Sequence, residues 1–352
     1  MKGLIPAAGL GTRLRPLTYT LPKPLLSVTN KPIIMYAIED LRDAGIVDIG
    51  IIVSDFVKAA LEKEGLEVAG VNISYIRQAD QLGIAHAVKQ AREWLAGDDF
   101  CLYLSDNLFE NGVQRYVEAF QTGDVDAVIA LVKVPNPKEF GVAVLDEAGN
   151  VMRILEKPKE PPSDLAVAGV YCFKNRVLDV IDSLEPSARG EYEITDAIQT
   201  LVKDGRVKGL EVIGWWKDTG RHDDLLDANR LLLERIEPEL LGETGDSRLV
   251  GRVRVEAGAV LKGCTVVGPA LIGAGSQLEN VYVGPFTSIG ENVTLRNMEI
   301  EFSIVQDEAR LEDIEVRLQE CLIGRKAQVK GSKRIPRVHR FVLSDTSVVE
   351  LG

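Results

Sequence analysis

Short apolar segments alternate with helical patterns along about the first 235 residues. The stretch "GLIPAAG" is typical of a strand that ends in a glycine-rich turn, "KPIIMYAIEDLRDAG" carries apolar residues at helical spacing, and "DIGIIVSD" is the next strand. A second helical pattern, "AHAVKQAREWLAG", leads directly into the strand "DFCLYLSDN". This alternation predicts βαβ units and an α/β domain with a Rossmann-like, mainly parallel sheet.

Beyond Val250 the period changes. Pairs of an apolar residue and a glycine recur at intervals of 17, 5, 11, 6 and 34 residues, each within two of a multiple of six; their glycines are Gly251, Gly268, Gly273, Gly284, Gly290 and Gly324. A repeat of six residues with short β-branched segments is typical of a parallel β-helix. Because the repeat is imperfect, an irregular β-sandwich stays open as an alternative.

These patterns divide the chain of 352 residues, which is longer than one ordinary core requires. We expect a sheet domain over 1–238 that closes with the helical pattern "DDLLDANRLLLERIEPELL". A linker over 239–249 contains "GETGDSR", a β-helix covers 250–333, and a C-terminal tail covers 334–352.

The overall charge excludes one class of partner. A net charge of -12 and a pI near 5.0 argue against nucleic-acid binding, which needs a basic face. No signal-peptide core and no run of 18 apolar residues occur, so we expect a soluble, cytoplasmic protein with no membrane partner. The cysteines form no CxxC pair and are expected to be reduced and buried; they are Cys101, Cys172, Cys264 and Cys321.

The first 38 residues are purely basic in this acidic chain, with five Lys or Arg and no acid. A strand that runs into Gly9-Leu10-Gly11 leaves backbone N–H groups open to an anion. Arg13, Arg15 and Lys23 add cations suited to phosphate oxygens. The motif matches neither GxxxxGK[ST] nor GxGxxG. We therefore predict a phosphate cradle, whereas Gly-x-Gly alone would indicate a glycine turn with solvated arginines.

Two acids stand at the ends of apolar segments far apart in the chain. Asp106 follows the strand "LYLS", and Asp218 lies in "GWWKDTG". Two carboxylates offered from separate strand ends suit Mg²⁺, which leaves its other positions to phosphates and water. Spacing in the sequence does not show that the two acids converge, and a lone Asp106 would equally serve as a cap.

Further candidates are Glu156 and Lys157 in "ILEKPKEPP", where prolines hold the chain extended after the pair. Arg189 stands just before a predicted helix start in "SARGEYEITDAI". Their ordinary interpretations are an exposed ion pair and a solvated arginine. No Ser-His-Asp, HExxH or Cys/His cluster is visible, which disfavours covalent acyl transfer and zinc hydrolysis.

Seven motifs in order resemble one family over essentially the whole chain: "GLGTRLRPLTYTLPKPLLSVTNKP", "QADQLGIAHAV", "LSDN", "FGVAVLD", "EKPKEPPSDLAVAGVY", "GEYEITDAI" and "WWKDTG". They resemble the sugar-1-phosphate nucleotidylyltransferases, and among them the long, thymidylyl-transferring members with a C-terminal left-handed parallel β-helix. The resemblance implies a reaction of dTTP with glucose 1-phosphate that gives dTDP-glucose and pyrophosphate. It also implies Mg²⁺ as cofactor, and we expect a homo-oligomer.

The resemblance also implies roles for single residues. Arg13, Lys23 and Lys157 would be catalytic, and Asp106 and Asp218 would hold Mg²⁺. The nucleotide would be bound by Ala8, Gly9, Gly11, Thr12, Arg13, Gln78, Gly83 and Asp106, with Gln78 on the pyrimidine edge. The sugar phosphate would be bound by Gly141, Glu156, Lys157, Val167 and Arg189.

The chain departs from the family pattern near the base-binding and lysine segments. Ala7-Ala8-Gly9 stands where many relatives have Ala-Gly-Gly, Lys23-Pro24 stands in place of Lys-Gln, and Ser27 replaces a common proline. UTP therefore stays open as the nucleotide. Two further alternatives are a non-catalytic regulatory subunit and an acyltransferase site in the β-helix. The latter is disfavoured because no histidine occurs between Val250 and Lys330.

Overall fold

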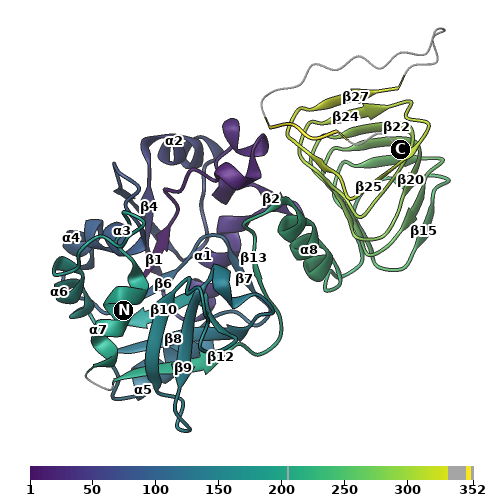
Figure 1. Cartoon of the computed structure of the whole chain (residues 1–352). Helices are drawn as coiled ribbons and strands as arrows, with labels where there is room; N and C mark the ends of the chain where they lie inside the picture. The colour runs from purple at the N-terminus through teal and green to yellow at the C-terminus, as the bar shows by residue number, and fades with distance from the viewer. Residues whose placement is uncertain (204–205, 332–345, 350–352) are drawn as a thin grey trace. The chain divides into compact units, whose positions relative to one another are not determined.

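The computed structural model describes residues 1–203, 206–331 and 346–349, so most of the predicted tail over 334–352 lies outside the described residues. The chain forms two compact units (Figure 1). The first contains Met1–Leu10, Pro22–Leu25 and Ile33–Asp218, and the second contains Gly11–Leu21, Leu26–Pro32 and the chain from Thr219 onwards. The second unit thus includes two short segments from the N-terminal region. The domain boundaries expected from the sequence stay a prediction.

A nine-stranded sheet forms the centre of the first unit. Its main order is β10-β9-β11-β6-β1-β4-β5, and β8 joins β11 to β12. The strands are β1 (Lys2–Pro6), β4 (Asp48–Val53), β5 (Asn72–Arg77), β6 (Phe100–Tyr103), β8 (Ala127–Lys133), β9 (Gly141–Leu145), β10 (Val151–Glu156), β11 (Leu165–Phe173) and β12 (Val207–Glu211). The part made of β6, β1, β4 and β5 is parallel, as predicted for a Rossmann-like domain. Because β11 runs antiparallel to β6, β8 and β9, the complete sheet is mixed.

The helices of the first unit cover the sheet through alternate strand residues. Leu102 of β6 belongs to the core that also contains apolar residues of α3, α6 and α7. The next residue, Tyr103, points the other way and donates a hydrogen bond of 2.8 Å to Asp40 of α1, as the period of two in a strand requires. The helices are α1 (Ile33–Asp43), α2 (Asp55–Glu64), α3 (Ile84–Gln90), α4 (Arg92–Leu95), α5 (Gln114–Thr122), α6 (Val177–Asp182) and α7 (Ile194–Val202), with short 3-10 helices η3 (Lys23–Leu25) and η4 (Pro137–Glu139).

A separate two-stranded ladder completes the first unit. It pairs β7 (Asn107–Phe109) with β13 (Trp216–Asp218) in the antiparallel sense. These strands are more than a hundred residues apart in the chain.

The C-terminal part of the second unit is a parallel β-helix (Figure 1). Arg248 pairs with Thr265 and Val253 with Ala270, so one coil takes 17 residues here, close to three hexapeptides. The strands are β14 (Glu239–Leu240), β15 (Arg248–Val250), β16 (Val253–Val255), β17 (Val260–Lys262), β18 (Thr265–Val267), β19 (Ala270–Ile272), β20 (Gln277–Val283), β21 (Thr287–Ile289), β22 (Thr294–Glu301), β23 (Ile304–Val305), β24 (Arg310–Glu312), β25 (Arg317–Gln319), β26 (Leu322–Ile323) and β27 (Gln328–Lys330). The predicted β-helix is therefore confirmed over the sandwich alternative.

Left-handed residues turn the corners of the coil. Asn280 and Asn297 have φ values of 54° and 47° and interrupt the long strands β20 and β22. Their side chains stack, since Asn280 donates to Asn297 at 3.0 Å and Asn297 donates to Asp313 at 2.8 Å. Asparagine suits this position because it tolerates the left-handed region better than most residues. Apolar side chains such as Val266, Val283 and Ile300 fill the interior.

The second unit also contains the 3-10 helices η1 (Thr12–Leu14) and η2 (Leu17–Tyr19), the hairpin of β2 (Ser27–Val28) and β3 (Lys31–Pro32), and helix α8 (His222–Leu233). Helix α8 is shorter than the predicted closing helix, which ran to Leu241. Pro238 cannot continue a helix, and Glu239 and Leu240 instead form β14, paired with β16 in the first coil.

Within the described part of the chain, no helix is both long and apolar enough to span a membrane. All four cysteines are free; three are buried, and Cys321 is partly exposed.

Candidate active site

The carboxyl ends of the parallel strands meet at one edge of the sheet, where open α/β sheets bind their ligands. Ala8 and Gly9 follow β1, Gln78 follows β5, and Asp106 follows β6 after a turn of two residues. A Cβ added to Gly9 would meet no atom within 4 Å, so its backbone is open to an approaching group. Four of the predicted nucleotide-binding positions therefore share this edge.

Lys23 and Asp106 form an ion pair at this edge. The Lys23 Nζ lies 2.6 Å from Asp106 Oδ2, and the Asn107 amide donates to Asp106 Oδ1 at 2.7 Å. Burial alone would raise the pKa of Asp106, but the Lys23 ammonium and the hydrogen bonds from Lys23 and Asn107 outweigh it and hold the pKa below 3.8. Asp106 is therefore an anion at neutral pH, and its partner is Lys23, which was also a candidate from the sequence.

The β7–β13 ladder places the second acid, Asp218, near Asp106. Asp218 is the register partner of Asn107, the residue that follows Asp106. Directly opposed residues of an antiparallel pair have Cα atoms about 4.5–5.5 Å apart. The two aspartates thus come from strands distant in sequence and lie at one end of a single ladder.

A partly buried hydrogen-bond network, which no sequence motif predicted, supports this arrangement. The Trp216 indole donates to Asn107 Oδ1 at 2.8 Å and to the Ala168 carbonyl at 3.0 Å. Gly169 has a φ of 75°, and a Cβ at that position would lie 2.7 Å from the Asn107 side chain. Only glycine suits this backbone. The signal available in the sequence was the "WWKD" motif, which places Trp216 two residues before Asp218.

The predicted sugar-phosphate residues come together on β9, β10 and β11. Gly141 pairs with Glu156 across β9 and β10. A Cβ on Gly141 would lie 3.2 Å from Glu156 Oε2, 3.4 Å from Val167 Cγ2 and 2.8 Å from Thr195 Cγ2. A side chain at this position would therefore crowd these three neighbours, and glycine avoids that contact. Thr195, which donates to Glu156 at 3.2 Å, was not singled out in the sequence.

Two cations lie against Glu156. Arg189 Nη1 is 3.4 Å and Lys157 Nζ is 3.8 Å from Glu156 Oε1. Arg189 also contacts Glu191 and Glu193, each at 3.3 Å. These ion pairs are partly exposed and contribute little to stability, so an incoming phosphate can compete for both cations. The backbone of Lys157 has a φ of 39°, a left-handed conformation of the kind that often occurs at functional positions.

Electrostatics connect Asp106 and the sugar-phosphate residue Glu156 through Tyr171. Burial raises the pKa of Tyr171, and the negative charges of Glu156 and Asp106 raise it further. The ring of Phe140, next to Gly141, also packs edge-on against Trp216 with the ring centroids 5.8 Å apart. The two groups of predicted residues thus border one region of the first unit.

The predicted base-binding residues are linked through His86, a residue of α3 for which the sequence predicted no role. The Gln78 amide nitrogen lies 3.0 Å from His86 Nδ1, and the His86 ring stacks on Tyr192 with the centroids 6.2 Å apart. A Cβ on Gly83 would lie 2.6 Å from the Tyr192 carbonyl oxygen. Gln78 is buried, and His86 therefore orients its amide.

The remaining predicted residues, Gly11, Thr12 and Arg13, belong to the second unit. Gly11 is left-handed with a φ of 60°, and its carbonyl accepts a hydrogen bond of 2.8 Å from the Thr18 hydroxyl. Arg13 lies exposed in the 3-10 turn that follows.

Known proteins are similar to this chain in sequence and in fold. A family model described as nucleotidyl transferase matches residues 2–235. Glucose-1-phosphate thymidylyltransferases of Streptomyces griseus and Streptomyces antibioticus are 44% and 43% identical over all of this chain and 100% and 99% of their own length. A crystal structure of a putative glucose-1-phosphate thymidylyltransferase from Bacillus anthracis, in complex with sucrose, is 36% identical with a TM-score of 0.61 and covers 68% of this chain and 98% of its own. The chain therefore belongs to the nucleotidyl transferase family.

Proposed function

We propose that this enzyme transfers a thymidylyl group from dTTP to glucose 1-phosphate and releases pyrophosphate, with Mg²⁺ as its metal. The observation that carries the proposal is the pairing of Lys23 with Asp106, which directly precedes the ladder that presents Asp218. The full-length similarity to thymidylyltransferases supports the choice of substrates.

The chemistry needs no nucleophilic side chain. An anionic phosphate oxygen of the sugar phosphate attacks the α-phosphorus, a new P–O bond forms, and the bond to the β-phosphate oxygen breaks. The electron pair leaves with pyrophosphate. The obstacle is repulsion between two polyanions, so the enzyme acts by positioning the reactants and stabilising their charge. Lys23 and Arg13 would stabilise the triphosphate, and Lys157 and Arg189 would bind the sugar phosphate.

The donor set at the ladder fits a magnesium ion. The low pKa of Asp106 keeps its carboxylate ionised. Proteins usually bind Mg²⁺ through one or two carboxylates, while phosphates and water fill its other positions. Asp106 and Asp218 would hold the ion, which supplies charge neutralisation for the phosphates when bound. Lys23 would then exchange part of its contact with Asp106 for a phosphate oxygen.

The sugar and the base would be selected on the two sides of this centre. The hexose would be contacted by three neighbouring residues that lie beside the sugar-phosphate cations: Gly141, Glu156 and Val167. Gln78, oriented by His86, would read the pyrimidine edge next to Gly83. UTP is the competing nucleotide, because a single methyl group contributes only about 1–3 kcal/mol of discrimination.

Pyrophosphate release tests the proposal. The purified enzyme is assayed with Mg²⁺ and glucose 1-phosphate against dTTP, UTP, CTP, ATP and GTP, with reactions lacking sugar phosphate as controls. We expect the highest kcat/KM with dTTP. A preference for UTP would correct the nucleotide alone, and absence of sugar-dependent release with both dTTP and UTP would contradict the proposed function.

A further inference from the structure

We propose that the β-helix positions the N-terminal loop of this enzyme for nucleotide binding, with Gln306 as a positioning residue. The inference rests on the proposed function for the nucleotide that the loop would bind. It starts from the composition of the second unit, which joins Gly11–Leu21 and Leu26–Pro32 to the β-helix across nearly three hundred residues of chain.

The hairpin of β2 and β3 is anchored to the β-helix and to α8 by hydrogen bonds. The Gln306 side chain donates to the Ser27 carbonyl at 2.9 Å, and the Asn30 side chain donates to the Ile289 carbonyl at 2.7 Å. The Thr29 N–H donates to Asn229 Oδ1 at 2.9 Å. Thr29 and Asn30 have positive φ values, as the two central residues of a tight type I′ hairpin turn do.

Asn229 of α8 connects this hairpin to the coil. It is fully buried, its amide donates to the Phe286 carbonyl at 3.1 Å, and its oxygen also accepts from the Ser288 hydroxyl at 2.9 Å. Buried polar groups that are satisfied in this way specify one arrangement of the elements they join.

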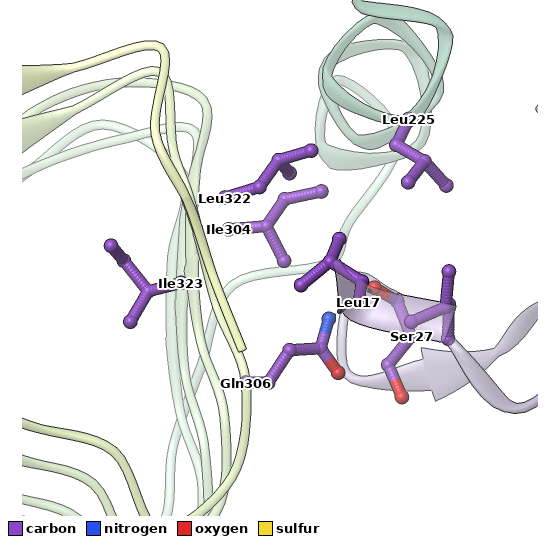
Figure 2. Close-up of a pocket in the computed structure, with 8 residues that line it drawn as sticks. Leu17, Ser27, Leu225, Ile304, Gln306, Leu322 and Ile323 are labelled. Carbon is purple, nitrogen blue, oxygen red and sulfur yellow. Dashed lines mark hydrogen bonds between the residues drawn. The ribbon is translucent and has the colours of Figure 1, made fainter. Parts of the chain in front are cut away.

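The Gly11–Leu21 segment lies against the coil through Leu17. A small apolar pocket is lined by Leu17, Leu26, Ser27, Leu225, Ile304, Gln306, Leu322 and Ile323 (Figure 2). Figure 2 shows Leu17 between Ile304 and Ser27, with the Gln306 amide directed towards the hairpin. Gly324 leaves room for Leu17, because a Cβ there would lie 3.3 Å from Leu17 Cδ2.

Two residues connect this contact to the segment around Gly11, which is part of the predicted phosphate cradle. Thr18 follows Leu17, is buried, and donates to the Gly11 carbonyl at 2.8 Å. Gly11 begins the 3-10 turn that carries Arg13. The coil at Gly324 therefore fixes Leu17, Leu17 fixes Thr18, and Thr18 fixes the backbone that presents Arg13.

Gln306→Met and Gly324→Ala test this assignment in the full chain. The first removes the donor to Ser27 at nearly constant volume, and the second crowds Leu17 without removing a hydrogen bond. Gln319→Met is the matched control, because Gln319 is exposed on β25 in the other sheet of the coil. Hydrogen–deuterium exchange of peptides covering 11–21 and 26–32 is measured together with KM for dTTP, KM for glucose 1-phosphate, kcat and Tm.

We expect faster exchange in both peptides for the two test variants. The KM for dTTP should rise about fivefold in Gln306→Met, the effect of one neutral hydrogen bond, and should also rise in Gly324→Ala, because the crowded Leu17 displaces the loop. The KM for glucose 1-phosphate and the exchange of β-helix peptides should stay as in the wild type, and Gln319→Met should behave as wild type. Unchanged exchange at 11–21, or faster exchange with unchanged nucleotide KM, would overturn the assignment. Absence of activity in the wild type would instead contradict the proposed function, while the exchange data would still decide whether the coil orders the loop.

Discussion

The ammonium nitrogen of Lys23 lies 2.6 Å from Asp106 Oδ2, which links the basic N-terminal segment directly to an acid at the carboxyl edge of the sheet. The pair is partly buried, with side-chain exposures of 13% for Lys23 and 30% for Asp106. The ion pair with Lys23 keeps the carboxylate of Asp106, a candidate metal ligand, ionised. The Lys23 side chain can then contact a substrate phosphate instead. This relationship leads to the first two predictions.

The Lys23–Asp106 pair should make stability depend on acidity. The folded pKa of Asp106 lies below its ordinary value of 3.8, so the unfolded chain binds more protons between the two values. The contribution is fully present above the unfolded pKa and is lost as the pH falls through the folded pKa. We expect Lys23→Met to lower the unfolding free energy at pH 6 and to differ less from wild type below about pH 4. Urea unfolding at both pH values measures this, and a constant difference would exclude the pair as its source.

Loss of either acid should impair catalysis through the metal. Asp106→Asn and Asp218→Asn keep the side-chain volume and remove a charge, and we expect kcat to fall at least about 100-fold with a higher Mg²⁺ requirement. Initial rates against Mg²⁺ concentration provide the measurement, and circular dichroism checks the fold. A folded Asp218→Asn enzyme with normal turnover would remove Asp218 from the metal site.

Gly169→Ala should lower activity by displacing Asn107, the neighbour of Asp106. The added methyl group would meet the Asn107 side chain at 2.7 Å, and the φ of 75° is strained for alanine. Gly45→Ala is a matched control, since Gly45 has a φ of 80° with no atom within 4 Å of an added Cβ. Backbone strain of about 1–2 kcal/mol is expected in both variants, and kcat should fall only in Gly169→Ala. Equal kcat in the two variants would show that Asn107 tolerates displacement.

His86 should control how Gln78 meets the base. His86→Leu removes the ring nitrogen 3.0 Å from the Gln78 amide, so we expect a several-fold higher KM for the pyrimidine nucleotide with little change in kcat. Gln90→Ala is the control, because Gln90 is exposed and contacts the other ring nitrogen, His86 Nε2, at 3.3 Å. Steady-state kinetics with dTTP and CTP measure the selectivity. If His86→Leu leaves KM unchanged, Gln78 is oriented without His86.

Gly141→Ala should act on the sugar side alone. Its backbone is an ordinary strand, so the effect of the added methyl group is steric, towards Glu156, Val167 and Thr195. We expect a higher KM for glucose 1-phosphate and an unchanged KM for dTTP. The opposite pattern in initial-rate kinetics would place the hexose elsewhere.

Local periodicity determined much of this protein in advance. The spacing of apolar residues predicted α1, β4 and β6, and the six-residue repeat predicted the β-helix, because both depend on which faces of short segments become buried. The positions of Gly9 and Asp106 just beyond two strand ends followed from the same pattern, since parallel strands share one carboxyl edge.

Tertiary structure alone decided which distant residues meet. The pairing of β7 with β13, which opposes Asn107 and Asp218, depends on a long-range register that no local pattern encodes. The antiparallel direction of β11, the hydrogen bond from Trp216 to Asn107, and the attachment of Ser27 to Gln306 arise in the same way. Each depends on contacts between segments that become neighbours only after the chain has folded, and so the sequence indicated the chemistry of these residues but not their partners.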